Sequence, residues 1–186
     1  MATTSENVTR DSKQYAEVLA EVFLDTVRRA EADVAESEMS KQDITPSLLE
    51  CLQYVYLHGP SHIGEIARGL EITLPAGSQL VDRLVKRDLA TRRESETDRR
   101  TIAVELTAAG RAAVRAFRKQ KSEWFASVIE SLSRDEMQAF VDGLEGFLGA
   151  ALEDDESVDH ACVRCGMKSV PFCIVKRIKD QRSNAR

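Results

Sequence analysis

Apolar residues recur along the first third of the chain at steps of three and four residues, with charged residues between them. This spacing places the apolar side chains on one face of a helix and predicts an amphipathic helix over about 12–39. A second helix is expected from Pro46 to Gly59. Thr45 is a favoured N-cap residue, and Pro46 suits the first helical position because the N–H that proline lacks has no intrahelical partner there.

Two further helical patterns follow, separated by a brief connection. Ser61 is expected to cap the first, which ends near Leu70, and the second is expected over about 74–88. A short helix, a tight turn and a second helix form the layout of a helix-turn-helix, whose second helix enters the major groove of DNA. In that helix the spacing separates inward-facing Leu80, Val81, Leu84 and Val85 from outward-facing Ser78, Gln79, Asp82, Arg83, Lys86 and Arg87.

The segment after this helix alternates with the period of a β-strand. Ile102, Val104 and Leu106 lie two apart and are expected to share one face. The preceding run 91–97 supplies an opposing strand and a polar hairpin tip. Arginines near such a tip can enter the narrow minor groove of A·T-rich DNA, where the negative potential is concentrated. A basic hairpin directly after a helix-turn-helix indicates the wing of a winged-helix domain.

Two long helices are predicted downstream of the hairpin. Thr107 is expected to cap the first, and Ser133 with Glu136 forms a capping box for the second, which ends near residue 152. Six helices and one hairpin make the expected fold mainly α with a small β-hairpin. The acidic run 153–156 lies where negative charge opposes the dipole of the last helix, so we expect a hinge there.

Length and composition favour one domain with a sizeable core, at 186 residues with 42% hydrophobic and 31% charged residues. No run approaches the roughly eighteen consecutive apolar residues of a membrane span, and the N-terminal segment lacks the apolar core of a secretion signal. A cytoplasmic protein with no membrane partner is therefore expected.

The net charge of −5 is unevenly distributed along the chain. Residues 61–120 hold 12 Lys and Arg against 8 Asp and Glu, and residues 160–186 hold 7 against 1. Residues 1–60 hold 5 against 11, and residues 121–159 hold 2 against 11. Because the local field near a phosphate matters more than the total charge, this distribution is compatible with binding to nucleic acid.

The sequence DRRTIAVELTAAG at residues 98–110 resembles the wing motif of the MarR family of bacterial transcriptional regulators. The resemblance covers about residues 12–152. It implies a winged helix-turn-helix headpiece at about 44–106 between dimerisation helices at about 12–39 and 107–152. It also implies a non-enzymatic homodimer, most often a repressor, that binds a palindromic operator in double-stranded DNA and responds to a small-molecule effector.

The same resemblance assigns DNA-binding residues by their positions in the motif. The first turn of the recognition helix usually meets base edges, and Gln79 could form two hydrogen bonds with adenine. Arginines of the helix and the hairpin are expected at phosphate or in the minor groove. For these charged residues the alternative is an ordinary solvated surface. The expected set is Ser61, Leu74, Pro75, Ala76, Ser78, Gln79, Arg83, Arg92, Arg93, Arg99 and Arg100.

Large aromatic residues on the predicted long helices favour a symmetric dimer, because they exceed what a small headpiece can bury. Completion of a core within one chain is the alternative. The residues are Phe23, Trp124, Phe125, Phe140 and Phe147.

Three of the four cysteines lie in the final 25 residues. Cys162 and Cys165 have the C-x2-C-G spacing of a metal knuckle, Cys173 follows, and His160 precedes them. Together these four residues could hold zinc or an iron–sulfur cluster, and the spacing does not distinguish the two. A thiol redox switch or an unligated tail is the remaining alternative.

The expected division of the chain is therefore a MarR-type winged-helix domain at residues 1–152 and an acidic hinge with a basic Cys-rich tail at residues 153–186. The basic side chains of the tail could contact phosphate or fold over the acidic segment, and a solvated basic terminus is the alternative. Cys51 lies on the inward face of its helix and is expected to be a buried free thiol.

Two other classes of function are considered. An enzyme with Cys162 or Cys165 as nucleophile is disfavoured because no base and orienting acid stand at a recognisable spacing. A protein-interaction module with a structural zinc knuckle and secondary DNA binding is the main alternative. It predicts that loss of the tail abolishes partner binding and spares operator binding.

Overall fold

The computed structural model describes residues 4–39, 43–94, 102–165 and 173–184. Within these ranges the chain forms eight helices and three strands, two helices more than the six expected. In chain order they are α1 (Thr4–Met39), α2 (Pro46–His58), β1 (Ser61–His62), α3 (Ile63–Gly69), α4 (Leu74–Lys86), β2 (Ala90–Glu94), β3 (Ile102–Leu106), α5 (Ala108–Glu130), α6 (Arg134–Ala151), α7 (Asp155–Cys165) and α8 (Ile174–Asn184).

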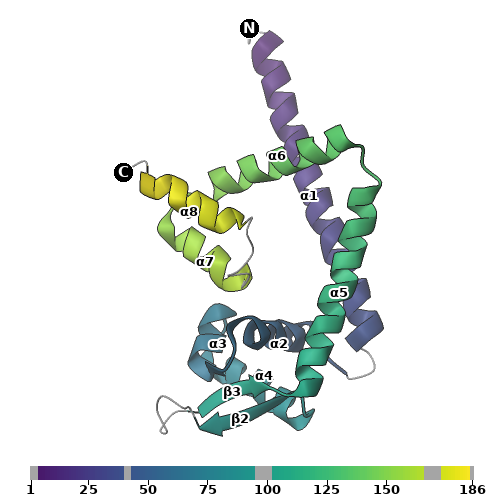
Figure 1. Ribbon diagram of the computed structural model, residues 1–186. Helices are drawn as coiled ribbons and strands as arrows, with labels where there is room; N and C mark the ends of the chain where they lie inside the picture. Colours follow the sequence, from purple (N-terminus) through teal and green to yellow (C-terminus); the bar gives the residue numbers. More distant parts are fainter. Residues whose placement is uncertain (1–3, 40–42, 95–101, 166–172, 185–186) are drawn as a thin grey trace.

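The elements separate into a headpiece and a set of long helices (Figure 1). The headpiece contains α2, α3, α4 and the sheet, and α5 leads from it to α6. α1 packs along α5. α7 and α8 lie between α6 and the headpiece, with α7 against α3. In the described part of the chain no helix combines the length and the apolar character needed to cross a bilayer.

The predicted hairpin is present as β2 and β3, and β1 adds a third antiparallel strand in the order β1-β3-β2. The facing pairs of β2 and β3 are Ala90 with Leu106, Thr91 with Glu105, Arg92 with Val104, Arg93 with Ala103 and Glu94 with Ile102. Val104 and Leu106 are buried as the alternation predicts, whereas Ile102 is 54% exposed. Ile102 lies at the tip end of the hairpin, where the headpiece no longer covers the strand.

The prediction that Ser61 caps α3 is wrong. Ser61 pairs with Val104 in β1, and the N-cap position of α3 belongs to His62. The backbone N–H of His62 donates to Glu65 Oε2 at 2.8 Å. The pairing with β3 requires an extended backbone at Ser61, and the helix begins at Ile63, one residue later than the cap prediction implied.

The headpiece core is built from the apolar helix faces and the inner face of β3. Its helices α2, α4 and α5 bring together the side chains that the periodicity placed inward, so those helix predictions are confirmed. The largest fully buried side chains of this core are Leu48, Leu52, Ile66, Val81, Leu84, Val104 and Val114.

The end of α4 and the start of α5 meet in a network of hydrogen bonds around Thr107. The Thr107 hydroxyl accepts from the Gly110 backbone N–H at 3.0 Å, which confirms it as the cap, and donates to the Asp88 carbonyl at 2.7 Å. The Thr107 backbone N–H donates to the Leu89 carbonyl at 3.0 Å. Asp88 has a positive φ of 56°, which turns the chain out of the helix toward β2.

Gly110 is required by the same junction. A Cβ at this position would collide with the Leu89 carbonyl oxygen, which is backbone and cannot move aside as a flexible side chain can. The glycine at the end of the wing motif therefore lets the first turn of α5 approach the turn after α4.

The aromatic residues of the long helices are only partly covered within the chain. Phe23 of α1 and Phe140 of α6 meet edge to face with ring centroids 6.0 Å apart, and Trp124 and Phe125 do so at 4.9 Å. Phe147 remains 65% exposed. These rings do not complete a buried core within one chain.

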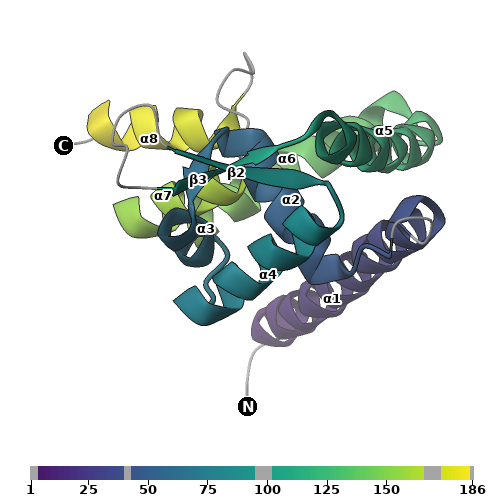
Figure 2. The same ribbon diagram turned by 90° about the horizontal axis from the view of Figure 1, so that it is seen from below.

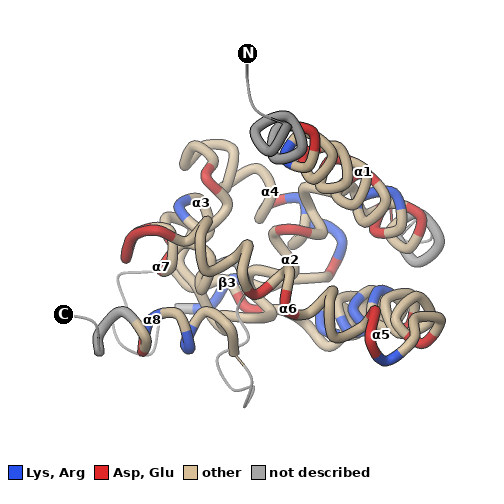
Figure 3. The backbone as a smooth tube through the Cα atoms, turned by 90° about the horizontal axis from the view of Figure 1, so that it is seen from above, with Lys and Arg blue, Asp and Glu red and all other residues tan. Residues whose placement is uncertain are grey.

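The tail differs from the expected hinge with a metal knuckle. α6 ends at Ala151, and the acidic run begins the new helix α7, where Asp155 and Glu156 lie in the first turn (Figure 3). Asp154 Oδ1 accepts from the Ser157 backbone N–H at 2.7 Å. Negative charge favours the N-terminal end of a helix, so the run stabilises α7. The run also follows directly after the C-terminal end of α6, as expected from the sequence, and there its negative charge is unfavourable to the dipole of α6.

We predict that Gly110→Ala lowers the free energy of unfolding by about 1–3 kcal/mol, because the new methyl group meets fixed backbone. Gly143→Ala is the matched control, since a Cβ at Gly143 has no neighbour within 4 Å. That control should leave stability unchanged or raise it by about 0.5–1 kcal/mol through helix propensity. Urea titrations followed by circular dichroism measure both, and equal effects of the two substitutions would contradict the packing role of Gly110.

Candidate nucleic-acid interface

The first turn of α4 is accessible to a ligand. The Thr73 hydroxyl accepts from the Ala76 backbone N–H, with 3.4 Å between oxygen and nitrogen, and so caps the helix. Leu74 is 59% exposed, and Pro75 and Gln79 are exposed as well. The end of the helix that was predicted to meet base edges therefore faces outward.

Gly77 has a packing role in the helix-turn-helix. It is buried, and a Cβ there would lie 3.1 Å from the Ala67 Cβ of α3. Ala76 and Ser78 on either side of it are half-buried. The cost of a glycine inside a helix is thus offset by the close approach of α3 and α4, and Gly77 does not belong to the DNA-facing side.

The cations of α4 fall into two groups. Arg83 and Lys86 are exposed. Arg87 is half-buried, with Nη2 2.7 Å from Asp43 Oδ2 and Nη1 donating to the Arg83 carbonyl at 3.5 Å. Arg87 therefore ties the end of α4 to the segment before α2, whereas Arg83 and Lys86 extend toward solvent.

An ion pair joins the hairpin to the recognition helix. Arg92 Nη2 of β2 lies 2.7 Å from Asp82 Oδ1 of α4. A guanidinium held this way has part of its hydrogen-bonding capacity engaged within the protein. Arg92 was predicted to bind DNA, and its contact with Asp82 also gives it the task of aligning the hairpin with the helix.

Glu105 organises the base of the hairpin. Its carboxylate lies 3.6 Å from Arg93 Nε and 3.7 Å from Arg111 Nη1. The same Nη1 donates to the Leu106 carbonyl at 2.6 Å. Arg93 is 73% exposed in its side chain, so it remains available at the surface beside this network.

Ser61 was predicted to bind DNA, but its side chain does not reach the surface. Ser61 is buried, and its hydroxyl donates to the Gly59 carbonyl at 3.0 Å, so its hydroxyl is engaged within the headpiece. Arg99 and Arg100 lie outside the described residues.

The exposed polar and basic residues of α4 and β2 gather at one end of the molecule. Figure 2 views this end directly, with α4 and the β2–β3 hairpin adjacent on the same side of the headpiece. Gln79 supplies a hydrogen-bonding amide, and Arg83, Lys86 and Arg93 supply positive charge. Such a surface can bind the phosphate backbone and present an amide to base edges.

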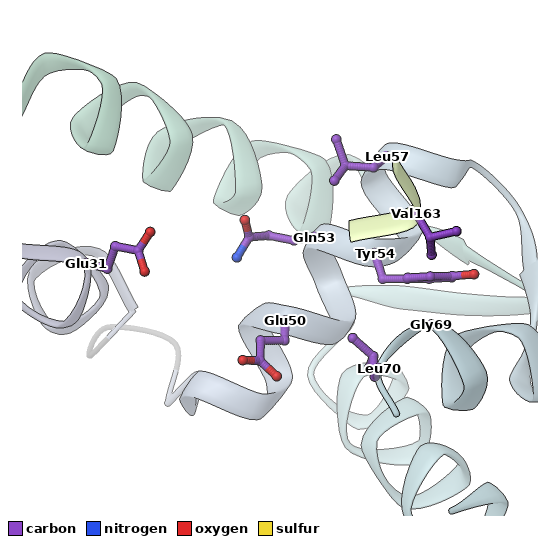
Figure 4. Close-up of a pocket in the computed structure, with 8 residues that line it drawn as sticks. All are labelled: Glu31, Glu50, Gln53, Tyr54, Leu57, Gly69, Leu70 and Val163. Atoms are coloured by element: carbon purple, nitrogen blue, oxygen red, sulfur yellow. The ribbon is translucent and has the colours of Figure 1, made fainter. Parts of the chain in front are cut away.

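Two cavities lie on the other side of α2, toward the long helices and the tail. One, of about 280 Å³, is lined by residues of α1, α2, α3 and α7 (Figure 4), namely Glu31, Glu50, Gln53, Tyr54, Leu57, Gly69, Leu70 and Val163. The second, of about 480 Å³, is lined by Gln53, Leu57, Arg118, Lys121, Ser122, Phe125 and Cys165. Lys121 of the larger cavity forms an ion pair with Glu31 of the smaller one. Val163 and Cys165 belong to α7, so each cavity has one wall from the tail.

The four predicted metal ligands are not assembled. His160 Nε2 contacts Glu71 Oε1 at 2.7 Å, and Cys173 Sγ accepts from the Lys176 backbone N–H at 3.5 Å. Cys165 lines the larger cavity. Among the described residues no group of three or more His, Cys, Asp or Glu side chains is close enough to hold a metal ion. In this arrangement the residues do not fit zinc or an iron–sulfur cluster.

Cys51 is a buried thiol, as predicted. Burial raises its pKa to about 12, so the reactive thiolate is scarcely populated near neutral pH. Cys162, Cys165 and Cys173 are half-buried. Thiol chemistry on this chain is therefore expected at the tail.

Several residues of structural importance were missed from the sequence. Asp82 was assigned only to the outward face of α4, and its pairing with Arg92 has no local signal. His58 Nε2 donates to the Val163 carbonyl at 2.7 Å, across 105 positions of the chain.

Among the basic residues of the tail, Lys179 contacts Asp159 Oδ1 at 2.8 Å, and this hydrogen bond raises the pKa of Lys179. The expectation named the acidic run 153–156, and Asp159 lies three residues beyond that run on α7.

Comparison with known proteins finds the same architecture elsewhere. The sequence model of the MarR family matches residues 42–101. The uncharacterized HTH-type transcriptional regulator YfiV of Bacillus subtilis is 31% identical over 118 residues, covering 63% of this chain and 73% of YfiV. The HTH-type transcriptional repressor MdtR of the same organism is 36% identical over 72 residues, covering 39% of this chain and 46% of MdtR. The crystal structure of Rv1404 from Mycobacterium tuberculosis aligns with a TM-score of 0.63 at 26% identity, covering 81% of this chain and 97% of that one.

Proposed function

The chain belongs to the MarR family of DNA-binding transcription regulators, and we propose that it is a homodimeric repressor of a palindromic operator. Members of this family regulate transcription and are not enzymes. The observation that carries the proposal is the Arg92–Asp82 ion pair, which aligns the basic hairpin with the recognition helix. MdtR is named a transcriptional repressor, and similarity to it supports repression.

Each headpiece would place α4 in a major groove and the hairpin over the adjacent minor groove. Gln79 in the accessible first turn would contact a base edge, and Arg83 would contact phosphate or a base. Arg93 would contribute charge beside the minor groove, with Arg99 and Arg100 as further predicted contacts. The buried Ser61 would support the sheet without touching DNA.

A second copy of the chain would cover the exposed apolar faces of α1 and α6. On α1 these residues include Tyr15, Val18, Leu19 and Val22, which are 48–64% exposed, and on α6 they include Phe147. Large contiguous apolar surface is uncommon on a monomer and favours a protein interface. Two copies related by a two-fold axis would also present two recognition helices to the two halves of a palindrome.

A small-molecule effector would bind in the two cavities between the headpiece, the long helices and the tail. Glu50 and Tyr54 line the smaller cavity, and Arg118 with Phe125 line the larger. Both offer charged and aromatic groups. The headpiece could take two positions relative to the long helices. A ligand in these cavities would change the affinity for DNA only if it bound more tightly to the protein in one of these positions than in the other.

The Cys-rich tail would serve as a sensing element. Sensing would rest on the thiols of Cys162, Cys165 and Cys173. Two of them would form a disulfide by losing two electrons and two protons to hydrogen peroxide, which is released as two water molecules. Binding of zinc or an iron–sulfur cluster remains a prediction, because His160 and the three cysteines would first have to come together.

We predict that Arg83→Ala weakens binding to duplexes selected from a random double-stranded pool by about 1–3 kcal/mol. If Arg83 contacts phosphate, the slope of log affinity against log salt concentration should also fall by about one. Fluorescence anisotropy at several salt concentrations measures both quantities. Arg134→Ala on α6 is the control, because Arg134 is exposed and lies outside the headpiece. A wild-type protein with no salt-sensitive binding to any duplex would refute DNA recognition by this surface.

We predict that Leu19→Asp raises the dissociation constant of the dimer roughly tenfold or more, because a carboxylate would have to enter an apolar interface. Sedimentation velocity over a range of protein concentrations measures this constant. Glu17→Gln on the same helix changes an exposed charge and should leave the constant within about twofold. A wild-type chain that stays monomeric at micromolar concentration would contradict the dimer.

We predict that operator affinity of protein purified without oxygen changes after exposure to air. The visible spectrum and the metal content before exposure show whether the tail holds an iron–sulfur cluster, zinc or no metal. Broad absorbance near about 400 nm indicates an iron–sulfur cluster, and a colourless protein with one zinc per chain indicates a zinc site. Metal-free protein should show alkylation of the three tail cysteines and protection of Cys51. Metal-free protein with the same affinity before and after air exposure would remove the sensing role.

A further inference from the structure

The tail shares a small apolar core with the end of α6. Val158 of α7 is 1% exposed and packs with Val175 and Ile178 of α8. Leu148 and Leu152 at the end of α6 pack against this cluster. An ion pair between Arg177 of α8 and Glu145 of α6 lies beside it. The α7–α8 pair is therefore attached to α6 by buried apolar surface as well as by charge.

The opposite side of α7 contacts the headpiece. His160 Nε2 lies 2.7 Å from Glu71 Oε1, in the turn between α3 and α4. Val163 accepts through its carbonyl from His58 Nε2 at the end of α2, and the His58 ring packs on Tyr54 with centroids 4.4 Å apart. The Val163 side chain also forms part of the cavity wall beside Tyr54 (Figure 4). The last two turns of α7 thus touch both helices that precede the recognition helix.

From these two sets of contacts we infer that the α7–α8 pair is an intramolecular clamp between α6 and the headpiece. Without it, α6 is joined to the headpiece through α5 and through the contact of Phe140 with Phe23 of α1, which packs along α5. With it, α6 is also connected to the headpiece through α7, and this further connection restricts rotation of one body against the other. In the proposed dimer this restriction would hold the two recognition helices at a defined separation, so the inference goes beyond the proposed function.

The docked tail does not bring the four predicted metal ligands together. His160 contacts Glu71 through Nε2, and Cys162 and Cys173 pack against the apolar cluster of Val158. A histidine can bind a metal through one ring nitrogen while the other contacts a carboxylate, so the contact with Glu71 does not by itself prevent coordination. Among the described residues no three such groups are close enough to hold a metal ion, so coordination by all four would require the tail to rearrange.

Two substitutions in the full-length protein separate the two ends of the clamp. Val158→Asp places a carboxylate in the small apolar core. Glu71→Gly removes the partner of His160, and glycine suits the positive φ of 56° at that position, so the α3–α4 turn is kept. Lys176→Ala is the matched control, because Lys176 is exposed on α8.

Hydrogen exchange of backbone amides measures whether the clamp is docked. We expect exchange in α7 to accelerate about tenfold or more in Val158→Asp and about twofold to fivefold in Glu71→Gly, because an exposed ion pair contributes less than a buried core. Exchange in α3 should accelerate in both, while α2 and α4 stay protected as evidence of a folded headpiece. Unchanged exchange of α7 and α3 in both variants, or equal acceleration in Lys176→Ala, would overturn the clamp.

DNA affinity provides a second measurement on the same proteins. A headpiece that moves freely loses more conformational entropy when the dimer binds two half-sites. Both variants should therefore lose about threefold or more in affinity for the selected duplexes. If the wild-type protein binds no duplex, the proposed function fails, and hydrogen exchange still tests the clamp. If the variants exchange faster and bind DNA as tightly as the wild type, the clamp does not position the headpiece and the inference is overturned.

Discussion

The junction between the turn after α4 and the first turn of α5 determines how the DNA-facing elements are arranged. Thr107 bonds to Asp88, Leu89 and Gly110 at once, through its hydroxyl and its backbone N–H. Gly110 permits the approach because no Cβ stands between α5 and the Leu89 carbonyl. One junction thus connects the end of the recognition helix, the end of β3 and the start of the long helix. A shift there would move the headpiece relative to α5.

Electrostatic contacts divide the basic residues of this surface into two kinds. Arg87 and Arg92 are engaged by Asp43 and Asp82, where they hold the recognition helix to its neighbours. Arg83 is exposed and can meet a phosphate without first giving up a partner such as Asp82. The net charge of −5 does not describe this surface, because the acidic excess lies in other segments of the chain. A mildly acidic protein can in this way present a local cationic face to DNA.

The tail changes how the long helices relate to the headpiece. A Cys-rich segment beyond the MarR-type domain could have extended into solvent, yet α7 and α8 lie between α6 and the headpiece, with α7 against α3. Both cavities have a wall from α7, through Val163 in one and Cys165 in the other. An effector, a thiol modification or a metal would therefore act on the same group of contacts. This shared location offers a physical route from the tail to the DNA-facing surface.

Although α7 and α8 were not expected, the sequence by itself determined six of the helices, the hairpin and the family. These depend on local periodicity, on caps such as Thr45, Thr107 and Ser133, and on the wing motif, all of which are contained in short stretches of chain. Tertiary structure alone decided that Ser61 forms a strand, because its partner Val104 lies 43 positions away. It also decided the placement of the tail, since His160 meets Glu71 through contacts that have no periodicity and no fixed spacing. The ligand spacing of the cysteines indicated a metal site, but spacing does not determine where a helix buries its apolar face, and that burial set the arrangement seen here.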